Sequence, residues 1–318
     1  MSGPVRNLAL VAIGGNAIIK GKTALSIPDQ YDMVRQVAVN LADMVEAGWN
    51  LAVTHGNGPQ VGFVLRRSEL SLAEVAPVPM DYAGADIQGA VGYMFCKALR
   101  NEFRRRGIRR EVVAVVTQTL VDSRDPAFAA PSKPIGSWFS EAEAKAKAET
   151  LGWHIAEDAG RGWRRVVPSP APKAIVEWPV IRNLAEEGHV VVALGGGGIP
   201  VIETEEGDLA GVEAVIDKDF ASSLLARELG ASFFMLPTGV DRVALHYGTP
   251  EQQWLDTLTS GRARELCREG NFDKGSMEPK MTALTDFVEA TGNPGVITSL
   301  ALMRDALEGK AGTRVIPG

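Results

Sequence analysis

The 318-residue chain contains few cysteines and histidines and no excess of basic residues. Its two cysteines, Cys96 and Cys267, are far apart in the sequence, which excludes the disulfide framework of small secreted proteins. The four histidines show no spacing typical of a zinc site, so we assign no protein ligand for a metal. Lysines and arginines number 33 against 39 aspartates and glutamates; the resulting net charge of −6 disfavours nucleic-acid binding.

Long apolar runs are also missing. No segment approaches the ~20 apolar residues that a membrane-spanning helix needs. Residues 1–15 have too short an apolar run for a signal peptide and lack its cleavage site. The sequence therefore predicts a cytoplasmic protein without a membrane partner, and 318 residues are enough to bury a large core.

Short apolar runs alternate with segments of helical spacing. The first half predicts strands at 7–13, 50–54 and 112–117 and helices at 26–48, 61–74 and 86–107. The second half predicts strands at 190–194, 214–216, 232–236 and 296–299, and helices at 179–188, at 220–230, from Glu251, from Lys280 and at the C-terminus. Strands that alternate with helices predict a parallel sheet covered by helices.

The composition changes between Phe128 and Pro172. This segment is rich in proline and holds three tryptophans, which indicates an insertion with a small aromatic core of its own. We expect a helix at 141–150 and a hairpin around 158–162. A lid over a cleft and a plain surface excrescence both fit this pattern.

Three glycine turns follow predicted strands: Gly14-Gly15-Asn16, Gly56-Asn57-Gly58 and Gly195 to Gly198. Glycine runs are most often simple turns. In an open α/β sheet, however, ligands bind outside the carboxyl ends of the strands, so we expect the three turns to converge on one crevice. Without side chains, their backbone amides are available to a polyanion.

Three lysines lie beside proline, glycine or a helix start: Lys133, Lys218 and Lys280. Single lysines of this kind are usually solvated, and Asp219 is also a good N-cap for the following helix. Together, the lysines suggest clamps on a phosphoryl group, because phosphoryl transfer needs mainly positioning and neutralisation of charge. An ammonium ~4 Å from a phosphoryl oxygen gains on the order of 4 kcal/mol at an effective dielectric constant of ~20.

Several stretches together resemble the amino-acid-kinase family, and the carbamate kinases within it. They extend over nearly the whole chain and include VAIGGNAI (11–18), THGNGPQVG (54–62), PSKPIG (131–136), DAGRGWRRVVPSP (158–170), ALGGGGIPV (193–201) and GSMEPK (275–280). The resemblance implies a single domain over residues 1–318. Its fold would be an α/β three-layer sandwich with a central, mostly parallel sheet of about eight strands and helices on both faces. A small protruding subdomain at 131–170 and a homodimer are also implied.

The resemblance also implies roles for individual residues. The end of the site that holds carbamate and the transferred phosphoryl group would be lined by Gly14, Gly15, Asn16, Gly56 and Asn57. Lys133, Lys218, Asp219 and Lys280 would be catalytic. The nucleotide would contact Gly196, Gly197, Asp217, Lys218, Thr238, Met277 and Lys280. The implied reaction is reversible phosphoryl transfer between ATP and carbamate, giving carbamoyl phosphate and ADP, with Mg²⁺, in arginine metabolism.

Two other functions stay open. One is a kinase of the same fold for another small carboxylate, which should need an extra basic residue; none stands out. The other is a non-catalytic binder of nucleotide or carbamoyl phosphate, which the intact lysines disfavour. The chain departs from the usual family residues at Tyr82-Ala83, at Ala85 to Ile87 and at Leu236 to Val240. Because the lysines and glycines are intact, we expect activity to survive these departures.

Overall fold

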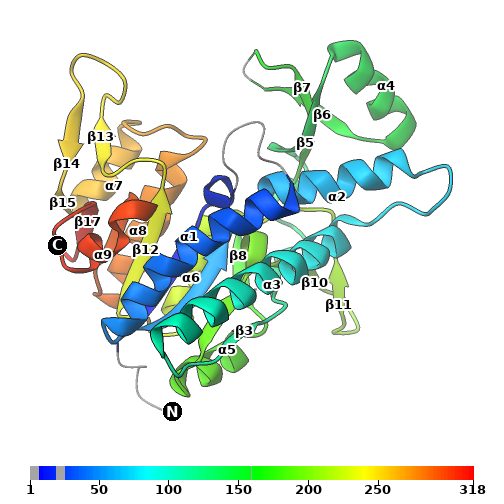
Figure 1. The fold of residues 1–318 in the computed structure, drawn as a ribbon. Coiled ribbons are helices and arrows are strands. Elements are labelled where there is room, and N and C mark those ends of the chain that lie inside the picture. Colours follow the sequence, from blue (N-terminus) through cyan, green and yellow to red (C-terminus); the bar gives the residue numbers. More distant parts are fainter. Residues whose placement is uncertain (1–6, 19–25, 159) are drawn as a thin grey trace.

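The computed structural model describes residues 7–18, 26–158 and 160–318. Within these ranges, eight strands form the central sheet in the order β15-β17-β16-β12-β1-β2-β9-β3 (Figure 1). Their bounds are β1 Leu8–Ile13, β2 Asn50–His55, β3 Val112–Ala114, β9 Val190–Ala193, β12 Phe233–Thr238, β15 Thr257–Thr259, β16 Gly295–Ser299 and β17 Thr313–Ile316. All neighbouring pairs are parallel except β16 and β17.

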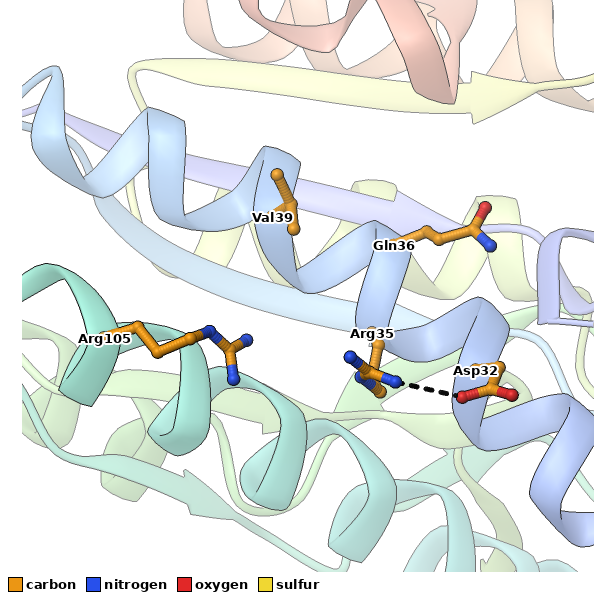
Figure 2. A pocket seen from close by; sticks show the side chains of 5 residues that line it. All are labelled: Asp32, Arg35, Gln36, Val39 and Arg105. Atoms are coloured by element: carbon orange, nitrogen blue, oxygen red, sulfur yellow. Dashed lines mark hydrogen bonds and ion pairs between the residues drawn. The ribbon is translucent and has the colours of Figure 1, made fainter.

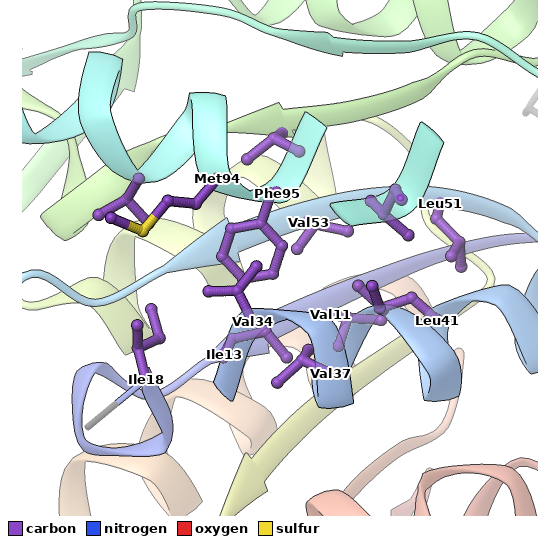
Figure 3. Packing of buried hydrophobic residues seen from close by; sticks show 14 of the residues in the cluster. Val11, Ile13, Ile18, Val34, Val37, Leu41, Leu51, Val53, Met94 and Phe95 are labelled. Carbon is purple, nitrogen blue, oxygen red and sulfur yellow. The ribbon is translucent and has the colours of Figure 1, made fainter. Parts of the chain in front are cut away.

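Helices cover both faces of this sheet, which confirms the three-layer prediction. One face carries α1 (Ile27–Glu46) and α3 (Met80–Arg106), and the other carries α5 (Trp178–Glu186), α6 (Lys218–Glu228), α7 (Ser260–Arg268) and α8 (Met277–Thr291). Figure 3 shows the first interface, where Val34 and Leu41 of α1 and Phe95 of α3 meet strands β1 and β2. No helix within the described ranges is long and apolar enough to cross a membrane.

The start of α1 illustrates why the longer elements were predictable. The Ser26 hydroxyl accepts a hydrogen bond from the Asp29 backbone amide, and the Asp29 carboxylate accepts one from the Ser26 amide, a capping box. Apolar residues then recur at three and four along a buried face. The helix predicted at 26–48 is therefore present as Ile27–Glu46.

Several short elements were predicted wrongly. Residues 214–216 form no strand; β10 (Ile199–Glu203) and β11 (Leu209–Gly211) instead pair in a second sheet with β4 (Gln118–Val121) and β8 (Pro172–Ile175). The helix expected from Glu251 is wrong, because β14 (Gln253–Leu255), which pairs with β13 (Val243–Leu245), and β15 precede α7. After α9 (Met303–Leu307) the chain adds β17, which was not predicted. β14 and β15 have three residues each, mostly outside the core, so they lack an apolar run.

A separate three-stranded sheet, β5-β7-β6, stands off beyond α2 (Gly58–Leu70) in Figure 1. It consists of β5 (Lys133–Phe139), β6 (His154–Glu157) and β7 (Trp163–Val167), with α4 (Glu141–Leu151) beside it. The predicted helix at 141–150 is confirmed as α4. The hairpin predicted around 158–162 connects β6 to β7; residue 159 lies outside the described ranges.

Candidate functional site

The first two glycine turns touch each other at the carboxyl ends of β1 and β2. A Cβ placed on Gly56 would lie 2.5 Å from the backbone nitrogen of Gly15. The position of a Cβ on Gly15 is 3.4 Å from the nitrogen of Asn57 and 3.5 Å from that of Gly58, where α2 begins. Only glycine allows this approach. Gly14 lies on the same edge; the backbone of Asn16 belongs to a short 3-10 turn, and its side chain is outside the description.

The third turn follows β9, the neighbour of β2, and Gly195, Gly196 and Gly197 in it are buried. The space where side chains are missing is filled by neighbouring groups. A Cβ on Gly195, Gly196 or Gly197 would collide with His55, Asn57 or Ile216 respectively. The expectation of four bare amides is therefore wrong: the amide of Gly197 donates to Leu194 O at 3.1 Å and that of Gly198 to Gly195 O at 3.2 Å. The amides of Gly195 and Gly196 donate to no described residue.

The three sequence-predicted lysines are all paired with aspartates at this edge. Nζ of Lys218 lies 2.7 Å from Oδ1 of Asp219, and Nζ of Lys280 lies 2.7 Å from Oδ2 of the same carboxylate. Nζ of Lys218 also donates to Ala12 O at 3.0 Å, at the end of β1. Lys133, at the start of β5, pairs with Asp217 at 2.9 Å.

The N-cap of α6 is Asp217, whose side chain accepts a hydrogen bond from the Asp219 amide at 2.9 Å. The alternative in which Asp219 caps this helix is therefore wrong. The Asp219 carboxylate is buried and lies between the ammonium groups of Lys218 and Lys280.

Burial and neighbouring charges have opposite effects on the pKa values of Lys218 and Asp219. Burial lowers the pKa of the Lys218 ammonium, and the Asp219 carboxylate partly opposes this shift. Burial would raise the pKa of the Asp219 carboxyl, but the Lys218 and Lys280 ammoniums hold it below its usual range. Asp219 is consequently a carboxylate at neutral pH. With protonated lysines, the three cations and two carboxylates give a net charge of 3 − 2 = +1, which suits an anion.

The sequence interpretation missed a layer of buried polar side chains behind the turns. His55 is stacked on Phe95, and burial lowers its pKa to about 4, so its ring is neutral. Oγ1 of Thr54 lies 2.7 Å from Oγ of Ser222, which joins β2 to α6. Gln88 binds the turn after β9. A polar residue within or just after a buried apolar run, such as Thr54 or His55, is the signal that could have revealed this layer.

Two predicted nucleotide contacts lie at the ends of secondary-structure elements that carry or neighbour the site. Thr238 ends β12, beside β1, and Met277 is the first residue of α8, the helix that carries Lys280. Within the described ranges, no hydrogen bond connects Thr238 or Met277 to the lysines. They share an edge with the site without joining its ion-pair network.

A surface hollow between α1 and α3 lies apart from this site (Figure 2). Its lining includes two arginines, but Arg35 is paired with Asp32 at 3.3 Å and Arg105 with Glu102. The glycine turns and the three lysines do not line this hollow. The sheet edge is therefore the better candidate for phosphoryl chemistry.

Comparison with known proteins agrees with the geometry. The model of the amino acid kinase family matches residues 7–299. The chain is 49% identical to a carbamate kinase of Thermococcus kodakarensis over 310 residues, which cover 96% of this chain and 98% of the relative. It is 44% identical to a carbamate kinase-like protein of Escherichia coli, over 98% of this chain and 99% of that one.

Solved structures are similar over the same length. A carbamate kinase from Giardia lamblia bound to AMP-PNP has a TM-score of 0.92 and 40% identity, and covers 98% of this chain and 99% of its own. An N-acetylglutamate synthase from Neisseria gonorrhoeae has a TM-score of 0.58 at 14% identity, over 98% of this chain and 60% of that one, which shows a shared fold alone.

Proposed function

The chain belongs to the amino acid kinase family, and we propose on that basis that it transfers a phosphoryl group reversibly between ATP and carbamate. It is an ATP-dependent kinase of the carbamate kinase type. The observation that supports this reaction best is the Lys218-Asp219-Lys280 cluster at the ends of the strands that carry the glycine turns.

The cluster has a direct use in phosphoryl transfer. Lys218 and Lys280 neutralise charge on the nucleotide phosphates and the migrating group, and Asp219 keeps both ammoniums in place. Gly14, Gly15, Asn16, Gly56 and Asn57 line the end of the site that holds carbamate, and Gly196, Gly197, Asp217, Thr238 and Met277 surround the nucleotide. Because the attacking carbamate oxygen is already anionic, the reaction needs no general base, and neutral His55 is consistent with that.

Lys133 reaches this cluster from the small sheet. We propose that residues 131–170 act as a lid that brings the Lys133 ammonium to the transferred phosphoryl group. Lys133 now neutralises Asp217 at 2.9 Å, and an incoming phosphate would compete with that carboxylate for the same ammonium.

Magnesium fits the site only with substrate present. Within the described residues, no group of three or more histidine, cysteine or acidic side chains could hold a metal ion. Asp217 and Asp219 are each occupied by lysines. Mg²⁺ would neutralise nucleotide phosphates, and phosphate oxygens and water would supply most of its ligands. A cytoplasmic homodimer in arginine metabolism stays a prediction.

ATP synthesis from carbamoyl phosphate and ADP with Mg²⁺ tests the proposal, with ATP measured by a luciferase assay. We expect ATP in proportion to enzyme, and none without carbamoyl phosphate. ADP binding without ATP formation would favour the non-catalytic binder. Transfer from ATP to acetylglutamate but not to carbamate would favour the other carboxylate kinase.

A further inference from the structure

One side chain holds the turn after β9 from behind. Gln88 of α3 is 5% exposed, and its Nε2 donates to Gly195 O at 3.1 Å and to Thr117 O at 3.0 Å. Its Oε1 accepts from the Thr117 amide at 2.7 Å. The Gln88 amide thus binds only main-chain groups, and it joins α3 to two segments that are remote from it in the sequence.

These bonds fix the orientation of one peptide unit. The Gly195 carbonyl accepts hydrogen bonds from both Gln88 and the Gly198 amide. In a trans peptide the C=O and the following N–H lie in one plane and point in opposite directions. Holding Gly195 O towards α3 therefore aims the N–H of Gly196 away from α3.

The Gly196 N–H is one of the two amides of the turn that donate to no described residue. A Cβ on Gly196 would lie 2.1 Å from Nδ2 of Asn57, so this glycine is next to the start of α2. Leu194 and Gly196 have left-handed φ values of 54° and 69°, and Gly195 between them does not. Alternation of this kind turns successive amides into one concavity, a common anion-binding arrangement.

A peptide between two glycines rotates easily, because neither neighbour has a side chain to resist it. Gln88 restrains it from outside the turn, in addition to the Gly198 amide, which donates to the same carbonyl. Gly195 is also enclosed: a Cβ there would lie 2.9 Å from Cγ of Gln88 and 2.5 Å from Cε1 of His55.

We propose that Gln88 is a positioning residue for phosphoryl transfer, which acts by aiming the Gly196 amide at a phosphoryl oxygen of the bound substrate. Gln88 itself touches no substrate. The inference rests on the proposed function and adds to it the residue that orients one of its hydrogen-bond donors.

Gln88→Met tests the inference by kinetics. It keeps the length of the side chain and removes all three hydrogen bonds. We expect the turnover number for ATP formation to fall roughly 10²-fold, in the range for loss of one donor to a developing oxyanion, with a smaller rise in KM for ADP. Thr119→Val is the matched control, because it removes the bond from Thr119 Oγ1 to Gly197 O at 2.8 Å in the same turn. The peptide that Thr119 restrains carries the Gly198 amide, already bonded inside the turn, so this variant should keep its turnover.

Isotope labelling reads out the Gly196 amide itself. With glycine labelled by ¹³C at the carbonyl and ¹⁵N at the amide, carbonyl-filtered NMR detects only glycine amides that follow another glycine. The sequence has four of them: Gly15, Gly196, Gly197 and Gly198. Addition of Mg²⁺ and AMP-PNP, an ATP analogue that does not transfer its phosphoryl group, should shift the Gly196 resonance in the unmodified protein and in Thr119→Val. In Gln88→Met the shift should be much smaller.

If the chemical shift of the Gly196 amide in the unmodified protein does not change on addition of the nucleotide, the inference is overturned. This outcome does not depend on whether Gln88→Met folds. Normal turnover in Gln88→Met overturns it as well. Absence of ATP formation by the unmodified protein is a different outcome, because it rejects the proposed reaction before Gln88 is tested.

Discussion

The central sheet and the small sheet β5-β7-β6 are stabilised by different interactions. All six residues of β1 are buried, and apolar helices cover both faces of the central sheet. In the small sheet, α4 buries only Ala144. Cations also stack on its aromatic rings: Nζ of Lys147 is 5.0 Å and the guanidinium carbon of Arg165 is 5.2 Å from the ring centre of Trp153. The central sheet is held by extensive apolar burial; the small sheet buries few apolar residues, among them Ile135, Val166 and Val167, and cation–ring contacts add to them.

Ion pairs also attach the small sheet to the rest of the molecule. Arg165 pairs with Glu213 at 2.6 Å, and Lys147 pairs with Glu69 of α2 at 3.5 Å. Such partly exposed pairs typically contribute about 0–1 kcal/mol each. Lys218 and Lys280 thus belong to the well-packed part of the molecule, and Lys133 to a small sheet that contacts it through a few buried apolar residues and partly exposed ion pairs. This difference is consistent with the proposal that Lys218 and Lys280 stay fixed while Lys133 moves with the lid.

Removal of residues 131–170 is the most severe test of this division. The ends of the segment are close together, since Lys133 pairs with Val167 across the small sheet, so a short glycine-serine linker can replace it. We expect a soluble core with a cooperative thermal transition and no ATP formation, because the core keeps most of its apolar cluster, without Ile135 and Val167, and loses Lys133. Full activity of the shortened protein would make the segment a surface excrescence.

Lys218→Ala should be the next largest effect. Turnover should fall roughly 10²–10³-fold, because loss of part of an ammonium–phosphoryl attraction raises the barrier by several kcal/mol. The protein should stay folded with a lower melting temperature, because Asp219 keeps its pairing with Lys280 while Ala12 O loses a donor. Lys145→Ala, in an exposed pair within α4, is the control. A near-normal rate in Lys218→Ala would contradict the clamp assignment.

Asp219→Asn should change the pH dependence of stability. The folded-state pKa of Asp219 is depressed, so its ion pairs stabilise the fold fully above the unfolded-state pKa of roughly 3.9. This stabilisation is lost as the pH falls towards the folded-state pKa. The free energy of unfolding, from urea titrations between pH 6 and pH 2, should therefore decline less steeply in Asp219→Asn below about pH 4. An unchanged slope would mean that Asp219 is not held ionised by the two lysines.

The smallest effect should come from Arg165→Met combined with Lys147→Met. These changes remove two attachments of the small sheet together with two cation contacts on Trp153, and leave the central sheet intact. Limited proteolysis within 131–170 should accelerate, consistent with a loss of about 1 kcal/mol or less for each pair, while the main thermal transition stays in place. Lys145→Met is a matched control, because Lys145 pairs with Glu141 inside α4. Equal protection in both variants would show that these pairs do not hold the small sheet.

Much of this architecture was accessible from sequence, because its signals are local. The helix at 26–48 follows from apolar spacing and a capping residue, and the meeting of the glycine turns at Gly15, Gly56 and Gly195 follows from parallel strands. Neither inference needs contacts between remote residues.

Other features depend on remote contacts and left no local signal. Gln88 meets Thr117 and Gly195, which are 29 and 107 residues away. The filling of the third turn by His55 and Asn57 has the same origin, so the glycines there first suggested open amides. Three-residue strands such as β14 form only through pairing with another strand, here β13, and their own sequence gives no strand pattern.

The contact between Gly56 and Gly15 has a consequence for how the site can vary. Backbone atoms contact backbone atoms there, so the distance between the ends of β1 and β2 does not depend on the size of any side chain. A methyl group at Gly56 would act as a wedge between β1 and β2. Side chains around the site can therefore be exchanged to fit a new acceptor while the spacing of these two turns stays constant.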